Sequence, residues 1–326
     1  MREREKIDQF GGRKFACVPD TYGSEGRYRW VQSLSAGGQG YAELCEDTWS
    51  DGLVVVKGAW WRDDELEPAI AQKTREDREH AFWRSVEIQL ELSHRTQSVP
   101  AVVELVSEVS PTRRKHGALV PPGYSTPDIN HESFLVMQFV GEADRTSRTL
   151  EELVDSEGPL DSAEAVALAD QVSAGLEAMH VPGSKRHYWA HSDLKPGNIL
   201  VSGHPRRFTI IDHGAAQRVS KGDPPEVEAA TDAFAPPRAD EKLTDRFDMY
   251  SLAATLVFAL TQEPPGRDVK IREIASDLAR RSVHPALIRL IATCLGEEAT
   301  YRITAQAFRR ELAAVNAFAA TEVLSR

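Results

Sequence analysis

The residues best suited to chemistry in this 326-residue chain lie in one short stretch, residues 191–200, which reads HSDLKPGNIL. It places an aspartate (Asp193), a lysine (Lys195) and an asparagine (Asn198) on one loop, because the proline–glycine pair between them favours a turn. The aspartate can accept a hydroxyl proton, the lysine can face a transferring phosphoryl group, and the asparagine can hold a metal ion. Phosphoryl transfer needs all three roles.

A second carboxylate follows closely. Residues 208–211 (FTII) predict a buried strand that ends at Asp212, His213 and Gly214, so Asp212 should lie beside Asn198. The polar groups of either stretch could be ordinary solvated loop residues. Two such motifs in this order, about fourteen residues apart and flanked by strand-like runs, favour a functional interpretation.

Together the two stretches resemble the catalytic loop and the Asp-Phe-Gly element of the eukaryotic-type (Hanks-type) serine/threonine protein kinases, with HSD for His-Arg-Asp and DHG for Asp-Phe-Gly. The resemblance implies that Asp193 and Lys195 are catalytic and that Asn198 and Asp212 hold Mg²⁺. It also implies ATP as the phosphoryl donor, bound between two lobes. The form D-L-K-P resembles the serine/threonine kinases more than the tyrosine kinases.

Residues 34–42, LSAGGQGYA, resemble the glycine-rich loop of that family, L-G-x-G-x-x-G-x-V. Ser35, Gly37 and Gly40 stand at its three glycine positions and Ala42 at its valine position, so one glycine is missing. Glycine matters there because backbone amides must approach phosphates closely. An ordinary hairpin turn would read similarly.

Residues 53–57, LVVVK, predict a strand that ends in a lysine and resemble the family's V-A-I-K strand. By that likeness Lys57 contacts the α and β phosphates of the nucleotide. A lysine at a strand end can also simply reach into water. The spacing of about seventeen residues from Gly40 favours the functional interpretation.

Residues 63–94 predict a long charged helix, the family's helix C, with one buried face made of Ala81, Phe82, Ser85, Ile88, Gln89 and Leu92. In the family a glutamate of this helix pairs with the strand lysine, but Ser85 stands at that position. Glu87 is near in sequence yet points elsewhere on an ideal helix. We favour Glu87 as the partner of Lys57, which requires an irregular or shifted helix, and another carboxylate stays open.

Two further strands are expected, over residues 102–105 and 134–140, separated by a stretch over 110–130 in which no packed element is expected. The second strand resembles the last strand of the small lobe and leads into the hinge. A plain buried strand would look the same. The nucleotide contacts implied by the resemblance are Leu34, Gly37, Gly40, Ala42, Val55, Lys57, Met137, Phe139 and Leu200.

An amphipathic helix begins at Asp161, with Glu164 completing a capping box. The stretch 181–190, VPGSKRHYWA, is longer than the family's turn at this place, so a longer turn is expected before His191. His191 is interpreted as a core residue that anchors backbone.

The activation segment, residues 213–238, carries Ser220 as its only hydroxyl residue before Ala230 and ends with Arg238 where the family has a glutamate. Asp248 opens a helix that is apolar on all sides through Leu260, and this carboxylate should brace the catalytic loop. In the family an arginine near the end of the domain pairs with the missing glutamate. Here Arg302 must find another acid, Asp240 or Glu241.

Composition narrows the possibilities. A net charge of −11 and a pI near 5.5 argue against a nucleic-acid surface as the main function. Three widely spaced cysteines suggest neither a disulfide framework nor a zinc site. The chain shows no long apolar run and no signal peptide, so we expect a cytoplasmic protein without a membrane partner.

These observations predict an α+β, bilobal protein-kinase-like fold with an N-terminal extension (1–27), a β-rich N-lobe (28–140) and a mostly helical C-lobe (141–326). The expected function is ATP- and Mg²⁺-dependent transfer of the γ-phosphoryl group to a serine or threonine hydroxyl of an unidentified protein substrate. A pseudokinase that binds nucleotide or partners, and a small-molecule kinase, stay open as alternatives. The oligomeric state is not legible from the sequence.

Overall fold

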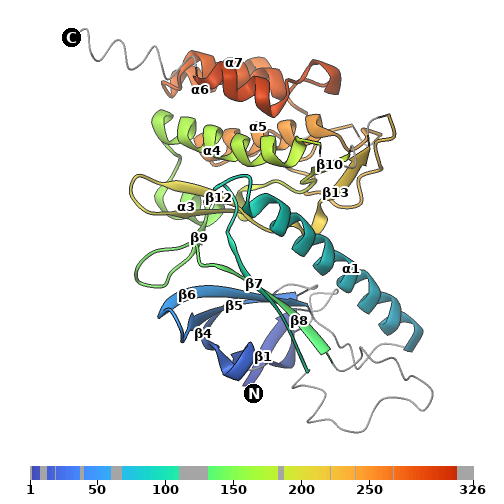
Figure 1. The fold of residues 1–326 in the computed structure, drawn as a ribbon. Coiled ribbons are helices and arrows are strands. Elements are labelled where there is room, and N and C mark those ends of the chain that lie inside the picture. The colour runs from blue at the N-terminus through green and yellow to red at the C-terminus, as the bar shows by residue number, and fades with distance from the viewer. Residues whose placement is uncertain are drawn as a thin grey trace. The chain divides into compact units, whose positions relative to one another are not determined.

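The computed structural model describes residues 2–7, 13–18, 20–36, 40–59, 68–109, 131–182, 187–220, 222–238, 240–266 and 268–313. The contacts of the chain group into two compact units (Figure 1). Unit 1 comprises Met1–Glu87 and Ala101–Phe139, and unit 2 comprises Ile88–Pro100 and Val140–Arg326. In the part of the chain that the structure describes, each helix is too short or too polar to span a membrane.

Unit 1 is built on an antiparallel six-stranded sheet in the order β3-β4-β5-β6-β8-β7. Its strands are β3 (Thr21–Tyr22), β4 (Tyr28–Ala36), β5 (Gly40–Asp47), β6 (Gly52–Ala59), β7 (Val102–Val109) and β8 (His131–Gln138). Near the N-terminus β1 (Arg2–Ile7) pairs with β2 (Arg13–Val18) in a separate hairpin. The expected strands over 102–105 and 134–140 are thus present, and the stretch 110–130 lies outside the described residues.

The two faces of this sheet follow from the alternation of β6. Val54 and Val56 are buried in an aromatic-rich cluster on one face, whereas Val55 and Lys57 point to the other and stay half-buried. Antiparallel partners share a face, so Ala42, which lies opposite Lys57, and Met137, which lies opposite Val55, belong to the Lys57 face. Four residues expected to contact nucleotide therefore share one face of the sheet.

The start of the sheet is fastened by Arg27. Its guanidinium binds both carboxylate oxygens of Asp47, at 2.8 and 2.7 Å, and reaches Glu104 on β7 at 3.0 Å. The hydrogen bonds from Arg27 hold the pKa of the Asp47 carboxyl at about 2, well below its usual value. Part of the predicted N-terminal extension is therefore integral to unit 1.

The long helix α1 (Pro68–Ser93) is continuous, and its predicted apolar face is confirmed. Phe82 and Val86 pack with Leu135 and Ala59 in unit 1, on the face of the sheet that carries Lys57. The last turns of the helix belong to unit 2, where Ile88 and Leu92 are completely buried in a second core. Of the other residues on the predicted face, Ser85 and Gln89 are buried and Ala81 is half-buried.

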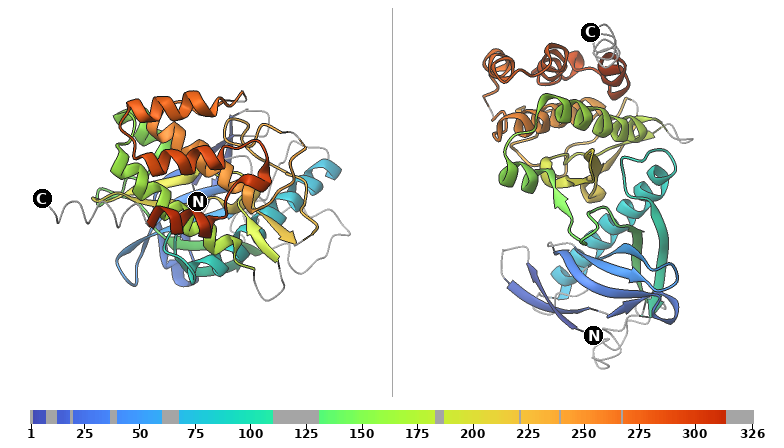
Figure 2. Two further views of the ribbon diagram at one scale, coloured as in Figure 1. Left: turned by 90° about the horizontal axis from the view of Figure 1, so that it is seen from above. Right: turned by 90° about the vertical axis from the view of Figure 1, so that its left-hand side faces the viewer.

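Unit 2 is mostly helical and packs around α5 (Asp245–Thr261), which lies beside α4 (Ser162–His180) in Figures 1 and 2. Each residue of α5 from Phe247 to Leu260 is buried, as its uniformly apolar sequence predicts. The capping box at the start of α4 is also confirmed, because the Asp161 side chain accepts from the Glu164 N–H at 2.8 Å. Unit 2 also contains α3 (Leu150–Glu157), α6 (Ile271–Arg280) and α7 (Pro285–Cys294), and residues 305–313 are helical.

The polar loops of unit 2 lie between short strands. One small sheet has the order β12-β11-β9, and a separate pair joins β10 to β13. Their bounds are β9 (Arg148–Thr149), β10 (His187–Ala190), β11 (Ile199–Ser202), β12 (Arg207–Ile210) and β13 (Gln217–Ser220). We expected a longer turn before His191. The last four residues of that stretch instead form β10, which pairs with the activation segment.

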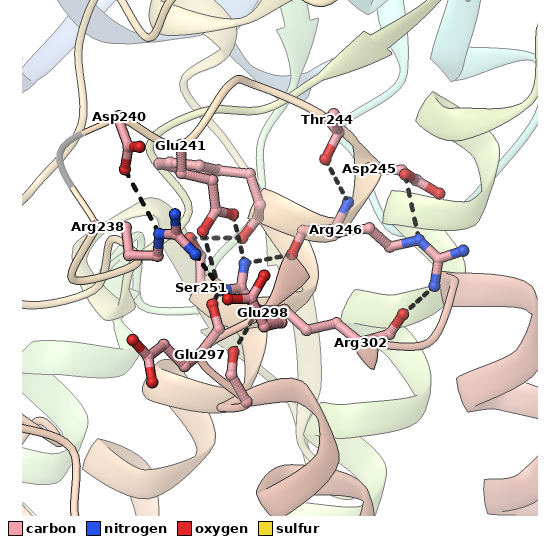
Figure 3. A network of polar contacts seen from close by, with 12 residues as sticks. Arg238, Asp240, Glu241, Thr244, Asp245, Arg246, Ser251, Glu297, Glu298 and Arg302 are labelled. Atoms are coloured by element: carbon pink, nitrogen blue, oxygen red, sulfur yellow. Dashed lines mark hydrogen bonds and ion pairs between the residues drawn. The ribbon is translucent and has the colours of Figure 1, made fainter. Parts of the chain in front are cut away.

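Figure 3 shows the polar network around Arg302, whose side chain is completely buried. Both guanidinium nitrogens that end the side chain bind Glu241, with Nη2–Oε2 at 3.0 Å, and Nε donates to the Gly296 carbonyl at 2.8 Å. The guanidinium also lies 5.0 Å from the centre of the Tyr250 ring. Of the two acids that the sequence offered, Glu241 is the partner of Arg302.

We predict that Glu241→Gln lowers the free energy of unfolding by about 3–5 kcal/mol, because a completely buried guanidinium then loses its counter-charge. The matched control is Asp240→Asn, since Asp240 is exposed and pairs with Arg238 on the surface, at 3.4 Å. Its stability should equal that of the unsubstituted chain within error. Denaturant unfolding followed by circular dichroism measures both variants, and equal losses would contradict the assignment.

Candidate active site

A buried carboxylate on α5 holds the start of the loop 191–200. Asp248 is completely buried and accepts from the backbone N–H groups of His191, at 2.8 Å, and Ser192, at 2.9 Å. His180 Nε2 at the end of α4 lies 2.8 Å from the same carboxylate. The predicted bracing role of Asp248 is confirmed, because its two oxygens bind both successive amides of the loop.

His191 is buried and structural, as expected. Its Nε2 lies 3.3 Å from the Ile211 carbonyl, and its ring centre lies 5.4 Å from that of His213. These contacts join the loop 191–200 to the element that begins at Asp212.

The two catalytic candidates are held together by a third residue. Lys195 Nζ donates to Asp193 Oδ2 at 2.8 Å and to Thr231 Oγ1 at 2.8 Å, and the Thr231 hydroxyl donates to Asp193 Oδ1 at 2.7 Å. The side chains of Asp193 and Lys195 keep 19% and 30% exposure, so both can still meet a substrate. Sequence reasoning gave Thr231 no role of its own. The available signal was that Thr231 begins the stretch TDAFAPPR, which ends the activation segment at Arg238.

The two metal-ligand candidates are also brought together. In the β11–β12 hairpin Ile199 lies opposite Ile210, and the Ile211 N–H donates to the Asn198 carbonyl at 2.9 Å. Asp212 follows directly, with its backbone in the left-handed region (φ 60°). The Asn198 amide nitrogen donates to the Asp193 carbonyl at 2.8 Å, which fixes the orientation of the side chain.

The donor set suits Mg²⁺. One carboxylate and one amide oxygen are hard ligands, and Mg²⁺ usually takes one or two protein oxygens and completes its shell with waters and phosphates. Because the Asn198 nitrogen is engaged with Asp193, its amide oxygen is the atom left for a cation. Within the described residues no cluster of three or more His, Cys, Asp or Glu side chains forms a closed metal site.

Unit 1 presents the nucleotide-contact candidates on its sheet. Ala42, Val55, Lys57 and Met137 share one face; Leu34 lies on β4 at an irregularity between Ser33 and Ser35, Phe139 directly follows β8, and Gly37 lies outside the described residues. Leu200 lies on β11 of unit 2.

Gly40 shows why its position requires a glycine. A Cβ atom there would lie 2.4 Å from the Gly58 carbonyl oxygen on the neighbouring strand. No side chain can relieve such a clash, because the opposing atom belongs to the backbone. The glycine therefore permits close strand approach at the edge of the predicted glycine-rich loop.

Comparison with known proteins decides the family. The family model for the protein kinase domain matches residues 32–311, most of the chain. The chain belongs to the protein kinase domain family. The fold expected from the sequence, a β-rich unit with one main helix followed by a mostly helical unit, is confirmed.

Several curated bacterial proteins are similar to this kinase domain. It is 28% identical over 280 residues to serine/threonine-protein kinase PknD of Mycobacterium tuberculosis (strain ATCC 25618 / H37Rv), across 84% of this chain and 35% of that protein. It is 25% identical over 249 residues to serine/threonine-protein kinase D of Synechocystis sp. (strain ATCC 27184 / PCC 6803 / Kazusa), across 73% of this chain and 41% of that protein. The chain spans about a third of the length of PknD.

The helix that should carry the acidic partner of Lys57 is regular. Ser85 is buried, whereas Glu87 is exposed, and α1 runs without interruption from Pro68 to Ser93. An interruption of α1, on which a Glu87 pairing depended, is not seen between Pro68 and Ser93. The exposure of Glu87 makes it the weaker candidate, and the acidic partner of Lys57 stays a prediction.

We predict that Lys57→Met abolishes phosphoryl transfer, because the nucleotide phosphates lose a cation. Glu87→Gln should leave the rate within about twofold of the unsubstituted chain, since an exposed helix carboxylate contributes little. Initial rates with labelled ATP and a generic protein substrate measure both. If Glu87→Gln were as inactive as Lys57→Met, Glu87 would be the partner after all.

Proposed function

We propose that this chain is a serine/threonine protein kinase that transfers the γ-phosphoryl group of ATP to a hydroxyl group of a protein substrate in the presence of Mg²⁺. The observation that carries the proposal is the hydrogen-bonded set of Asp193, Lys195 and Thr231 beside Asn198 and Asp212. The kinase family and the printed names of the bacterial relatives support it. The D-L-K-P form supports serine or threonine as the acceptor.

Each group in unit 2 has a separate task. Asp193 accepts a hydrogen bond from the acceptor hydroxyl, orients it and takes its proton as the new phosphate ester bond forms. Lys195 lies 2.8 Å from Asp193, where its ammonium can balance charge on the transferring phosphoryl group. Asn198 and Asp212 would hold Mg²⁺, which neutralises phosphate charge when bound. Thr231 keeps the lysine and the aspartate aligned.

In unit 1, Lys57 is proposed to contact the α and β phosphates, and Leu34, Gly37, Gly40, Ala42, Val55, Met137 and Phe139 are proposed to contact the nucleotide, together with Leu200 of unit 2. The mechanism is positioning and charge neutralisation, with no covalent intermediate on the protein.

We also propose that the chain acts in the cytoplasm. ATP is available there, and reduced thiols suit that compartment. Within the described residues Cys45 and Cys294 are buried and are not joined in a disulfide, and burial raises the pKa of the Cys294 thiol to about 12. Such a thiol resists oxidation and alkylation while the chain stays folded.

We predict that Asp193→Asn lowers the transfer rate at least 10³-fold and leaves ATP binding intact, because this residue acts on the acceptor hydroxyl and not on the nucleotide. Transfer of labelled phosphate measures the first effect, and the thermal shift induced by ATP measures the second. A variant that transferred at the unsubstituted rate would remove Asp193 from the mechanism.

Asp212→Asn should instead weaken the dependence of nucleotide binding on Mg²⁺, because a neutral amide is a poorer ligand than a carboxylate. Titration of ATP at several Mg²⁺ concentrations measures this dependence. An unaltered dependence, combined with absent transfer in the unsubstituted chain, would favour a pseudokinase.

We predict that activity does not require phosphorylation of the activation segment. An arginine before the catalytic aspartate can grip a phosphate, but Ser192 stands there and cannot. Its hydroxyl instead donates to the Ala229 carbonyl at 2.8 Å. Phosphatase treatment and Ser220→Ala should each leave the transfer rate within about twofold of that of the untreated, unsubstituted chain. Initial-rate assays measure this, and a large loss in either case would contradict the prediction.

A further inference from the structure

The activation segment is held to the rest of unit 2 at successive points by hydrogen bonds from neutral donors, and Glu226 adds an ion pair with Lys242. The Leu243 N–H donates to the Pro225 carbonyl at 3.0 Å, and Ser192 donates to the Ala229 carbonyl at 2.8 Å. Two residues farther on, Thr231 donates to Asp193 at 2.7 Å. The segment thus reaches the catalytic aspartate already fastened through its backbone.

Gln217 adds a link between two parts of the segment. It lies on β13, opposite Ala190 of β10, and only 5% of its surface is exposed. With its amide oriented to face complementary groups, Gln217 donates to the Glu226 carbonyl at 3.1 Å and accepts from the Glu228 N–H at 2.9 Å. One neutral side chain therefore satisfies two backbone groups of the segment, because an amide carries both a donor and an acceptor.

The same part of the segment also packs on an apolar cluster. Val219, Leu243 and Phe247 are buried there together with Ala190, and Val227 and Ala230 of the segment pack against them. The side chains of Glu226 and Glu228, in contrast, are exposed. The backbone of residues 225–230 is thus supported by this cluster, and on the exposed side Glu226 also forms an ion pair with Lys242.

The spacing connects Gln217 to the chemistry. Only two residues separate Glu228, whose N–H Gln217 binds, from Thr231, whose hydroxyl contacts both Asp193 and Lys195. If residues 226–229 moved away, Thr231 would lose its place against the aspartate. A fixed backbone of this kind requires neither a phosphate nor a cluster of basic residues.

We propose that Gln217 is a positioning residue for phosphoryl transfer, which holds residues 226–228 so that Thr231 stays against Asp193 and Lys195 in the unphosphorylated chain. This role rests on the proposed kinase function. Gln217 touches neither reacting group, so it acts through the activation segment alone.

The test compares Gln217→Met, which keeps the size of the side chain and removes both hydrogen bonds, with Gln217→Glu. For Gln217→Met we expect kcat/KM for a peptide substrate to fall about tenfold, the effect of one or two ordinary hydrogen bonds. The KM for ATP and the unfolding midpoint should change little. Ser220→Ala, on the exposed end of the same strand, is the matched control and should retain the unsubstituted kcat/KM.

Gln217→Glu adds a readout that a merely structural role would not give. Its carboxylate can accept from the Glu228 N–H but cannot donate to the Glu226 carbonyl, whereas the protonated acid can do both. Burial favours the protonated form. The activity of Gln217→Glu relative to the unsubstituted chain should therefore recover as the pH falls from 8 towards 5.5, whereas that of Gln217→Met should not.

Cleavage by a glutamate-specific protease tests the proposal independently of catalysis. Cuts after Glu226 and Glu228, followed by mass spectrometry, should be at least fivefold faster in Gln217→Met than in the unsubstituted chain, because a released backbone is easier to cleave. Unchanged cleavage together with unchanged kcat/KM, or an equal loss in ATP binding and peptide transfer, would overturn the role of Gln217. If the unsubstituted chain transferred no phosphate but cleavage were still faster in Gln217→Met, the proposed kinase function would fail. The role of Gln217 in holding residues 226–228 would then stand.

Discussion

The geometry of the candidate site depends on one buried carboxylate. Asp248 is completely buried in a helix that is mostly apolar, where an unpartnered charge would be very costly. Two backbone amides of the catalytic loop and the ring of His180 satisfy it. Because these amides belong to the two residues directly before Asp193, the position of the catalytic aspartate follows from the folding of α5.

From that anchor the site extends by short, mostly neutral links. The loop 191–200 joins the Asp212 element through the Asn198 carbonyl and the ring of His191, and it joins the activation segment through Ser192. Apart from the anchoring carboxylate of Asp248, the charged groups of the site are those proposed to act on the acceptor hydroxyl, the phosphate or its metal. A site arranged in this way gains its order from backbone hydrogen bonds, which do not depend on the ionic conditions as exposed ion pairs do.

The sequence predicted those features that depend on local spacing. The capping box at Asp161, the uniformly buried helix after Asp248 and the proximity of Asn198 to Asp212 each follow from residues near one another in the chain, and each was found. The bridging role of Thr231 was missed, because its contact with Asp193 joins residues 38 positions apart. A spacing rule cannot show that a hydroxyl group returns to a loop so far away.

The choice between Asp240 and Glu241 as the partner of Arg302 is a second case that residue order could not decide. Asp240 and Glu241 adjoin in sequence and carry equal charge, yet the Glu241 side chain is 7% exposed beside the completely buried Arg302, and that of Asp240 is 79% exposed. The cost of burying a guanidinium decides between them, since only an acid that enters the interior can offset it. Which acid enters the interior depends on the direction in which each side chain leaves the backbone. Composition and residue order do not give that direction. The glutamate missing from the family's position is thus replaced by an acid three residues after Arg238, through the same charge pair formed from a different point of the chain.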